Sequence, residues 1–163
     1  MLSWRNPVDF AKKEVGQVNI YLLLGSPGAG KSHYCSRNFT NVQVVSCDVI
    51  RESMFGSIRS YEIRQKVLQE IKNIVSGKVA LRQDVVLDTT YFNELEARSF
   101  LFGFGGSVKV HAIYIATSLS DCLERNKMRA TERVVSDEMV EMLYARISPP
   151  SDGERFESIT IVN

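Results

Sequence analysis

The stretch that decides the fold is VNIYLLL at residues 18–24, followed without a break by GSPGAGKS at residues 25–32. The second part matches G-x-x-x-x-G-K-[ST], the pattern of a phosphate-binding loop, and it lies between an apolar strand and a helix start, as such a loop must. Gly25, Gly28 and Gly30 allow backbone torsions and a close approach that a Cβ would obstruct. The stretch therefore predicts a strand, a phosphate-binding loop and a helix in direct succession.

Each part of the loop has a chemical task. Successive backbone N–H groups, helped by the helix N-terminus, are expected to wrap a di- or triphosphate. The loop residues are Gly25, Ser26, Pro27, Gly28, Ala29 and Gly30. We expect Lys31 to reach the outer phosphates and the Ser32 hydroxyl to bind Mg²⁺. A glycine-rich turn that binds nothing is the alternative, and the strand context and the terminal Lys-Ser pair disfavour it.

Composition places few limits on function. The chain has 163 residues, 44% hydrophobic and 24% charged, which suits one globular domain with a sizeable core. A formal net charge of +1 argues against binding a polyanion by bulk charge, but it permits a local basic groove. Cys35, Cys47 and Cys122 are odd in number and widely spaced, so neither a disulfide framework nor a zinc site is indicated.

Residues 1–17 are interpreted as a short extension or N-terminal helix without assigned chemistry, and residues 18–163 as one domain. The extension carries charged residues and no apolar core suited to a signal peptide. No stretch approaches the length of a membrane span. We therefore expect a cytoplasmic protein.

Apolar runs alternate with helical patterns along the chain, which is typical of a parallel α/β sheet. The predicted strands are residues 18–24, 42–47, 85–88, 108–116 and 159–162. The predicted helices are residues 31–39, 60–76, a helix capped by Asn93 that runs to the glycines at 103–106, 119–127, and 137–146, which Pro149 and Pro150 stop. Ligands of such sheets bind at the carboxyl ends of the strands, so residues that follow the strands are the candidates for a site.

Asp48 follows the second strand, and Arg51 lies three residues later, one turn on if a helix begins there. A carboxylate at that place can accept a proton from an attacking hydroxyl, and the arginine can bind a phosphate on the acceptor. A helix-capping aspartate beside a solvated arginine is the alternative, and these two residues alone leave both open. Asp88 ends the third strand, where it could hold the magnesium shell, orient Arg51, or cap a turn.

A third cluster contains Arg125, Arg129 and Arg133 after a predicted helix. Cations there could close over the triphosphate and neutralise charge during phosphoryl transfer, with Arg129 the first candidate and Arg125 the second. Acidic residues are interspersed, so a solvated charged face is the alternative. The aspartates lack a glycine three positions later, and Asn126-Lys127-Met128-Arg129 ends in a cation where guanine recognition needs a carboxylate, so a GTPase switch is disfavoured.

The phosphate loop, Asp48-x-x-Arg51, Val-Leu-Asp88-Thr-Thr and Arg125-Asn126-x-x-Arg129 together resemble the 5′-hydroxyl polynucleotide kinase family over about residues 18–163. The resemblance implies a five-stranded parallel sheet of order 2-3-1-4-5, helices on both faces and a short arginine-containing lid. It also implies roles for single residues. Asp48 would be the general base on the 5′-OH, Arg51 would engage the acceptor's 3′-phosphate, Asp88 would support the site, and Arg129 would contact ATP phosphates.

The resemblance leads us to expect a kinase that uses ATP and Mg²⁺ to phosphorylate the 5′-hydroxyl end of RNA or DNA. Related architectures serve kinases of small metabolites, nucleotides and antibiotics and zeta-type toxins, and Asp48 does not discriminate among them. A non-catalytic nucleotide-binding partner is the other rival, which the combination of Asp48 with Arg51 disfavours. Only substrate testing separates these acceptor classes.

Overall fold

The computed structural model describes residues 14–163. Most of the expected N-terminal extension, residues 1–13, lies outside the described residues. No helix in the part of the chain that is described combines the length and the apolar character needed to cross a membrane.

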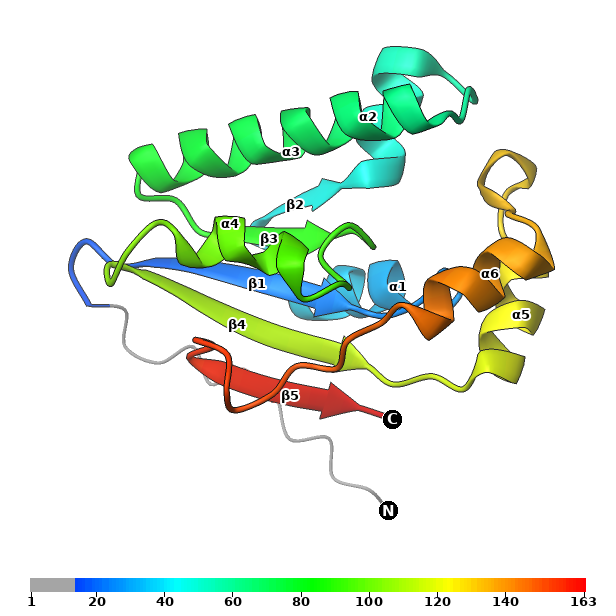
Figure 1. The fold of residues 1–163 in the computed structure, drawn as a ribbon. Coiled ribbons are helices and arrows are strands. Elements are labelled where there is room, and N and C mark those ends of the chain that lie inside the picture. Colours follow the sequence, from blue (N-terminus) through cyan, green and yellow to red (C-terminus); the bar gives the residue numbers. More distant parts are fainter. Residues whose placement is uncertain (1–13) are drawn as a thin grey trace.

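Five parallel strands form a single sheet, in the order β2-β3-β1-β4-β5. Their bounds are Val18–Leu24 for β1, Gln43–Ser46 for β2, Val85–Asp88 for β3, Val108–Ile115 for β4 and Ser158–Val162 for β5. The predicted strand order and the all-parallel arrangement are confirmed. All arrowheads point toward one edge, where α5 and α6 lie (Figure 1).

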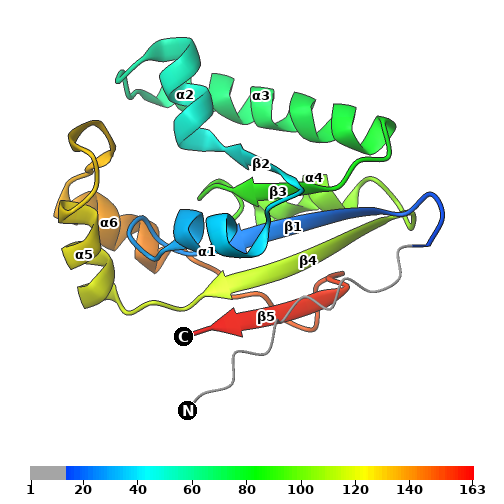
Figure 2. The same cartoon turned by 180° about the vertical axis from the view of Figure 1, so that it is seen from behind.

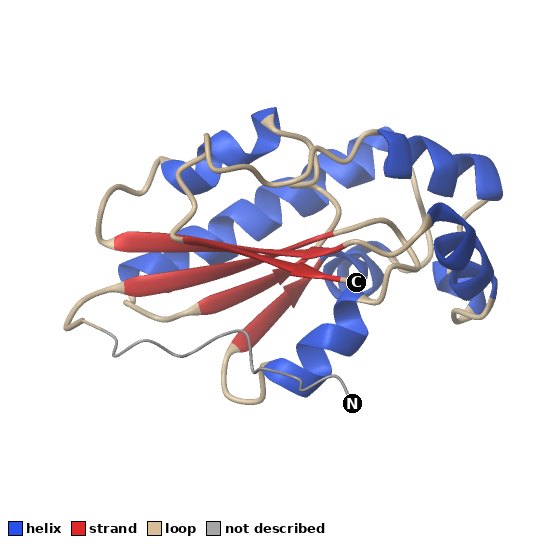
Figure 3. Cartoon of the chain, turned by 90° about the horizontal axis from the view of Figure 1, so that it is seen from below, coloured by secondary structure: helices blue, strands red, loops and turns tan. Residues whose placement is uncertain are grey.

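Helices cover both faces of the sheet, as Figure 3 shows. On one face lie α3 (Tyr61–Ala80) and α4 (Ser99–Phe102), and on the other lies α1 (Lys31–Asn38), which is in front in Figure 2. The remaining helices are α2 (Cys47–Phe55), α5 (Leu119–Lys127) and α6 (Asp137–Ala145). Two short 3₁₀ helices complete the fold, η1 (Glu96–Arg98) and η2 (Thr131–Arg133).

The central strand β1 is buried along its whole length, and its side chains alternate between two hydrophobic clusters. Ile20 and Leu22 pack in the cluster that contains residues of α3 and α4. Tyr21 and Leu23 pack in the cluster that contains residues of α1, α5 and α6. This alternation follows from the period of two along a strand, and burial on both faces explains why the sequence of β1 is almost entirely apolar.

Some predicted elements were wrong in their bounds or type. Cys47 was assigned to the second strand, but it is the first residue of α2, because the Ser46 side chain accepts a hydrogen bond from the Val49 amide and caps that helix. The helix expected to start at Asn93 is replaced by the short helices η1 and α4. Asn93 is no cap, because its side chain is bonded instead to the backbone of Gly25.

Candidate active site

The loop between β1 and α1 has the geometry of a phosphate cradle. Gly30, the N-cap of α1, has a φ of 104°, and Gly28 has a φ of 82°, a region that L side chains rarely adopt. A Cβ on Gly28 would also collide with the carbonyl oxygen of Cys122, so the loop packs tightly against α5. The backbone N–H groups of Gly28, Lys31 and Ser32 have no acceptor among residues 14–163. Such free amides at a helix N-terminus form an anion-binding site.

Lys31 is buried at the floor of this loop, with 8% of its surface exposed. Its Nζ donates hydrogen bonds of 2.9 Å to the carbonyl oxygens of Gly25 and Ser26. Burial lowers the pKa of Lys31, and the charges of Asp88 and Asp48 act in the opposite direction. The ammonium group is thus held inside the loop, in position to bind a phosphate oxygen.

Ser32 and Asp88 meet beside the loop, at the ends of α1 and β3. The Ser32 hydroxyl donates a hydrogen bond of 2.6 Å to Oδ2 of Asp88. A hydroxyl and a carboxylate are hard oxygen ligands, and Mg²⁺ in kinase sites is held by one or two such groups plus substrate phosphates. The donor set therefore fits Mg²⁺ bound together with a nucleotide, which agrees with the role expected for Ser32. Asp88 contacts Ser32, and no hydrogen bond joins it to Arg51 within residues 14–163.

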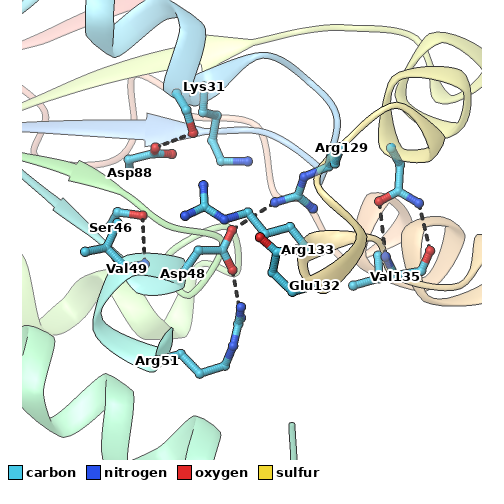
Figure 4. A network of polar contacts seen from close by, with 12 residues as sticks. Lys31, Ser46, Asp48, Val49, Arg51, Asp88, Arg129, Glu132, Arg133 and Val135 are labelled. Carbon is cyan, nitrogen blue, oxygen red and sulfur yellow. Dashed lines mark hydrogen bonds and ion pairs between the residues drawn. The ribbon is translucent and has the colours of Figure 1, made fainter. Parts of the chain in front are cut away.

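Asp48 lies between two arginines from different parts of the chain, as Figure 4 shows. Its Oδ1 accepts a hydrogen bond of 2.7 Å from Arg51, one turn along α2, and its Oδ2 accepts one of 2.9 Å from Arg129. Burial raises the pKa of Asp48, but the hydrogen bond from Arg51 and the charge of Arg129 outweigh it and hold the pKa below its usual value. Asp48 is consequently ionised at neutral pH and able to accept a proton.

Arg51 is only 9% exposed, although it carries a full charge. One of its nitrogens bonds Asp48, whereas Nε and Nη2 are buried without a hydrogen-bond partner among the described residues. Nη2 lies 3.6 Å from Glu52, beyond hydrogen-bonding distance, and both oxygens of Glu52 accept hydrogen bonds from Arg133. Since buried N–H donors are almost always satisfied, two free donors on one guanidinium indicate a place for an anionic ligand.

The segment of residues 128–136, which we call the lid, is joined to the α2 side of the site by three contacts. Arg129 bonds Asp48, Arg133 bonds Glu52 with two hydrogen bonds of 2.7 and 2.8 Å, and Arg59 donates to the carbonyl oxygen of Glu132. The hydrogen bonds from Arg133 hold the pKa of Glu52 below its usual value. The lid thus bridges the site from α5 to α2.

Arg125 approaches the loop from α5, and its Nη1 donates a hydrogen bond of 3.3 Å to the carbonyl oxygen of Ala29. Arg125 and Arg129 therefore lie on the loop side and the Asp48 side of the same opening. Sequence reasoning named both, and it also named Arg133 without predicting that Glu52 would bind it.

A cavity of about 850 Å³ is lined by the phosphate loop and Ser32, by Asp48 and Asp88, and by the arginines at 51, 125 and 129. Two carboxylates, Asp48 and Asp88, line it, against six cationic side chains, Lys31, Arg51, Arg59, Arg64, Arg125 and Arg129. The excess of positive charge contrasts with the formal net charge of +1 for the whole chain. A basic cavity in a near-neutral chain suits ligands that bring several phosphates.

Two buried residues that sequence reasoning did not assign to the site support it from behind. The Asn93 side chain accepts a hydrogen bond from the Gly25 N–H and donates one to the Gly25 carbonyl oxygen, at 3.0 and 2.9 Å. Arg98 is fully buried and donates to the Asn93 carbonyl oxygen while pairing with both carboxylate oxygens of Glu154. Asn93, held in place by Arg98, therefore anchors Gly25, the first residue of the phosphate loop. No local sequence signal distinguishes this buried arginine from a surface one, because its charge partner Glu154 lies 56 positions away in the chain.

Comparison with known proteins agrees with the fold and the loop. The family model AAA_33, described as an AAA domain, matches residues 20–150. No match was found among curated proteins. Among solved structures, the chain is similar to one chain of the Pnkp1/Rnl/Hen1 RNA repair complex, with a TM-score of 0.68 and 17% identity over 80% of this chain. It spans 44% of that larger chain.

Two further structures are similar along nearly their whole length. A gluconokinase from Sinorhizobium meliloti 1021 matches with a TM-score of 0.58 and 16% identity, covering 88% of this chain and 81% of its own. The APS kinase CysC of Mycobacterium tuberculosis, solved with AMPPNP and APS, matches with a TM-score of 0.57 and 13% identity. The match covers 89% of this chain and 88% of the APS kinase chain. These likenesses establish a P-loop kinase fold and leave the acceptor undecided.

Proposed function

The chain belongs to the AAA domain family AAA_33, and from this premise we propose that it is an ATP-dependent kinase acting on the 5′-hydroxyl end of RNA or DNA. The observation that carries the proposal is the buried guanidinium of Arg51. It is bonded to Asp48, it has two unfilled N–H donors, and it lines the same cavity as the phosphate loop. An acceptor that carries a phosphate next to its reacting hydroxyl would satisfy both donors and place the hydroxyl near Asp48.

The cavity divides into a donor end and an acceptor end. At the donor end, the loop amides, Lys31 and Arg125 would bind the triphosphate of ATP. Ser32 and Asp88 would hold Mg²⁺, which when bound neutralises charge on the outer phosphates. At the acceptor end, Asp48 would orient the hydroxyl and take its proton.

Arg129 joins the two ends. In this structure it is bonded to Asp48, and a triphosphate in the loop would compete for it, since a guanidinium binds phosphate oxygens in pairs. Transfer of Arg129 from Asp48 to the γ-phosphate would free one oxygen of the carboxylate for the acceptor hydroxyl. Because the transition state of phosphoryl transfer is largely metaphosphate-like, such positioning and charge neutralisation supply most of the catalysis.

The similar structures bear on the acceptor in different ways. One belongs to an RNA repair complex, and the others are a gluconokinase and an APS kinase. Their shared fold supports phosphoryl transfer, while the resemblance of Asp48-x-x-Arg51 and the arginine lid to polynucleotide kinases supports a nucleic-acid acceptor. A phosphate on the acceptor is what the free donors of Arg51 require, and gluconate lacks one.

Transfer of label from [γ-³²P]ATP to a panel of acceptors tests the proposal. The panel holds 5′-OH oligoribonucleotides and oligodeoxyribonucleotides, nucleoside 3′-monophosphates, gluconate and adenylyl sulfate. We expect labelled 5′-phosphate on the oligonucleotides and the 3′-monophosphates, and none in the Asp48→Asn variant. Labelling of gluconate or adenylyl sulfate with none on the nucleotides would replace the proposal with a small-molecule kinase.

A further inference from the structure

We propose that Arg64, backed by the ring of Tyr91, is a stacking platform for the nucleobase next to the reacting hydroxyl. The inference rests on the proposed function and names the part of the acceptor that the Arg64 side of the cavity contacts. A base-binding platform requires the acceptor to carry a nucleobase, whereas the contacts of Arg51 require only that it carry a phosphate.

The platform consists of a guanidinium that lies over an aromatic ring. The guanidinium carbon of Arg64 lies 5.2 Å from the centroid of the Tyr91 ring. Tyr91 is fixed in a turn after β3, where its N–H donates to the Thr89 hydroxyl, and its ring packs against the main hydrophobic core. Arg64 is in the first turns of α3, whose start Ser60 caps. Arg64 therefore extends from a helix, and Tyr91 from a turn that packs against the core.

The platform lies on the acceptor side of the cavity. Arg64 and Tyr91 line it together with Arg51 and Asp48, and the apolar side chains of Ile63 and Val67 form the neighbouring wall. Burial raises the pKa of Tyr91 to about 12. The charge of Asp48 also raises this pKa, and the charge of Arg51 lowers it. The phenol therefore stays neutral at physiological pH and remains a plain aromatic support for the guanidinium.

Arg64 is not neutralised by a carboxylate within the described residues. Among residues 14–163 it forms no ion pair, and the neighbouring carboxylate of Glu62 is bound by Lys66 at 2.8 Å. Its guanidinium lies over the Tyr91 ring, and the side chain is half-buried at the cavity wall. A planar cation stacked on an aromatic ring beside apolar side chains is the surface on which unstacked bases bind, whereas a sugar acceptor needs hydrogen-bonding groups instead.

The test compares two acceptors that share the 5′-hydroxyl and the 3′-phosphate. One is deoxyadenosine 3′-monophosphate, and the other is its abasic tetrahydrofuran analogue. We expect the wild-type protein to prefer the nucleotide by about 5- to 150-fold in kcat/KM, the range that stacking of one base supplies. Arg64→Ala should reduce the preference to near 1. Arg64→Lys, which keeps the charge and loses the plane, should reduce it as well.

Lys66→Ala is the matched control, since Lys66 is on the same helix, is exposed and, within the described part of the chain, pairs with Glu62 alone. It should keep the full preference. Equal rates with both acceptors in the wild-type protein, or a full preference retained by Arg64→Ala, would overturn the platform and leave the kinase proposal standing. No transfer to either acceptor, nor to a 5′-OH oligonucleotide, would overturn the kinase proposal itself and the platform with it.

Discussion

Substitution of Arg51 tests whether the acceptor carries a phosphate beside its hydroxyl. Arg51 is 9% exposed, and its buried Nε and Nη2 have no hydrogen-bond partner among residues 14–163. Removing one member of a buried, hydrogen-bonded charge pair costs about 2–4 kcal/mol, which corresponds to about 30- to 1000-fold in kcat/KM. Arg51→Ala should lower kcat/KM for both acceptors. The loss with a nucleoside 3′-monophosphate should exceed the loss with the plain nucleoside by that factor.

The comparison of two acceptors isolates the phosphate contact from other effects of the substitution. Losing Arg51 also removes a hydrogen bond to Asp48 and raises the pKa of that carboxylate, but this change acts equally on both acceptors. Initial rates of label transfer, measured below saturation for each acceptor, give the ratio directly. Arg51→Lys should show an intermediate ratio, because an ammonium lacks the paired donors. A wild-type protein that ignores the 3′-phosphate, or a ratio unchanged by Arg51→Ala, would refute the reasoning.

Two further substitutions probe the lid and the support of the loop. Arg129→Ala should lower transfer by roughly 10- to 150-fold, as expected for loss of a charge-assisted bond, while Lys127→Ala should remain near wild type; equal activities would make the lid a solvated surface. Because Arg129 helps to lower the pKa of Asp48, a pH profile of kcat/KM should show the acid limb of Arg129→Ala displaced to higher pH. Asn93→Ala leaves the Gly25 N–H without its acceptor and should lower the free energy of unfolding by about 1–3 kcal/mol. Denaturant unfolding measures this, and an unchanged midpoint would show that the Asn93 side chain does not hold the loop.

The sheet could be predicted from sequence because its signals are local. The apolar run of β1, followed by the glycine-rich loop, determines the central strand and the start of α1 by residue type alone. The helix predicted at residues 119–127 has the observed bounds of α5, and in the structure Ser118 caps its start. Helix α3 extends beyond the predicted end at residue 76, because the apolar spacing that predicts it stops at Val75, whereas the helix continues to Ala80.

The site was predictable as a set of residues, and its contacts were not. Asp48, Arg51 and Arg129 were named from their places after strands and helices, but the pairing of Asp48 with Arg129 spans 81 positions and follows from the tertiary fold. Asn93 was interpreted as a helix cap because a cap needs only a local pattern. Its actual partner, Gly25, lies 68 positions away.

The central claim is that one cavity binds ATP at the phosphate loop and the acceptor at Asp48. Binding of a non-hydrolysable ATP analogue by the Asp48→Asn and Lys31→Ala variants, measured by calorimetry beside label transfer, tests it most directly. Both variants should lose transfer, and Lys31→Ala should also lose affinity for the analogue. Asp48→Asn should bind the analogue as tightly as the wild-type protein or more tightly, since Arg129 is then released from its carboxylate partner. A loss of affinity in Asp48→Asn comparable to that in Lys31→Ala would place Asp48 on the donor side and contradict the account.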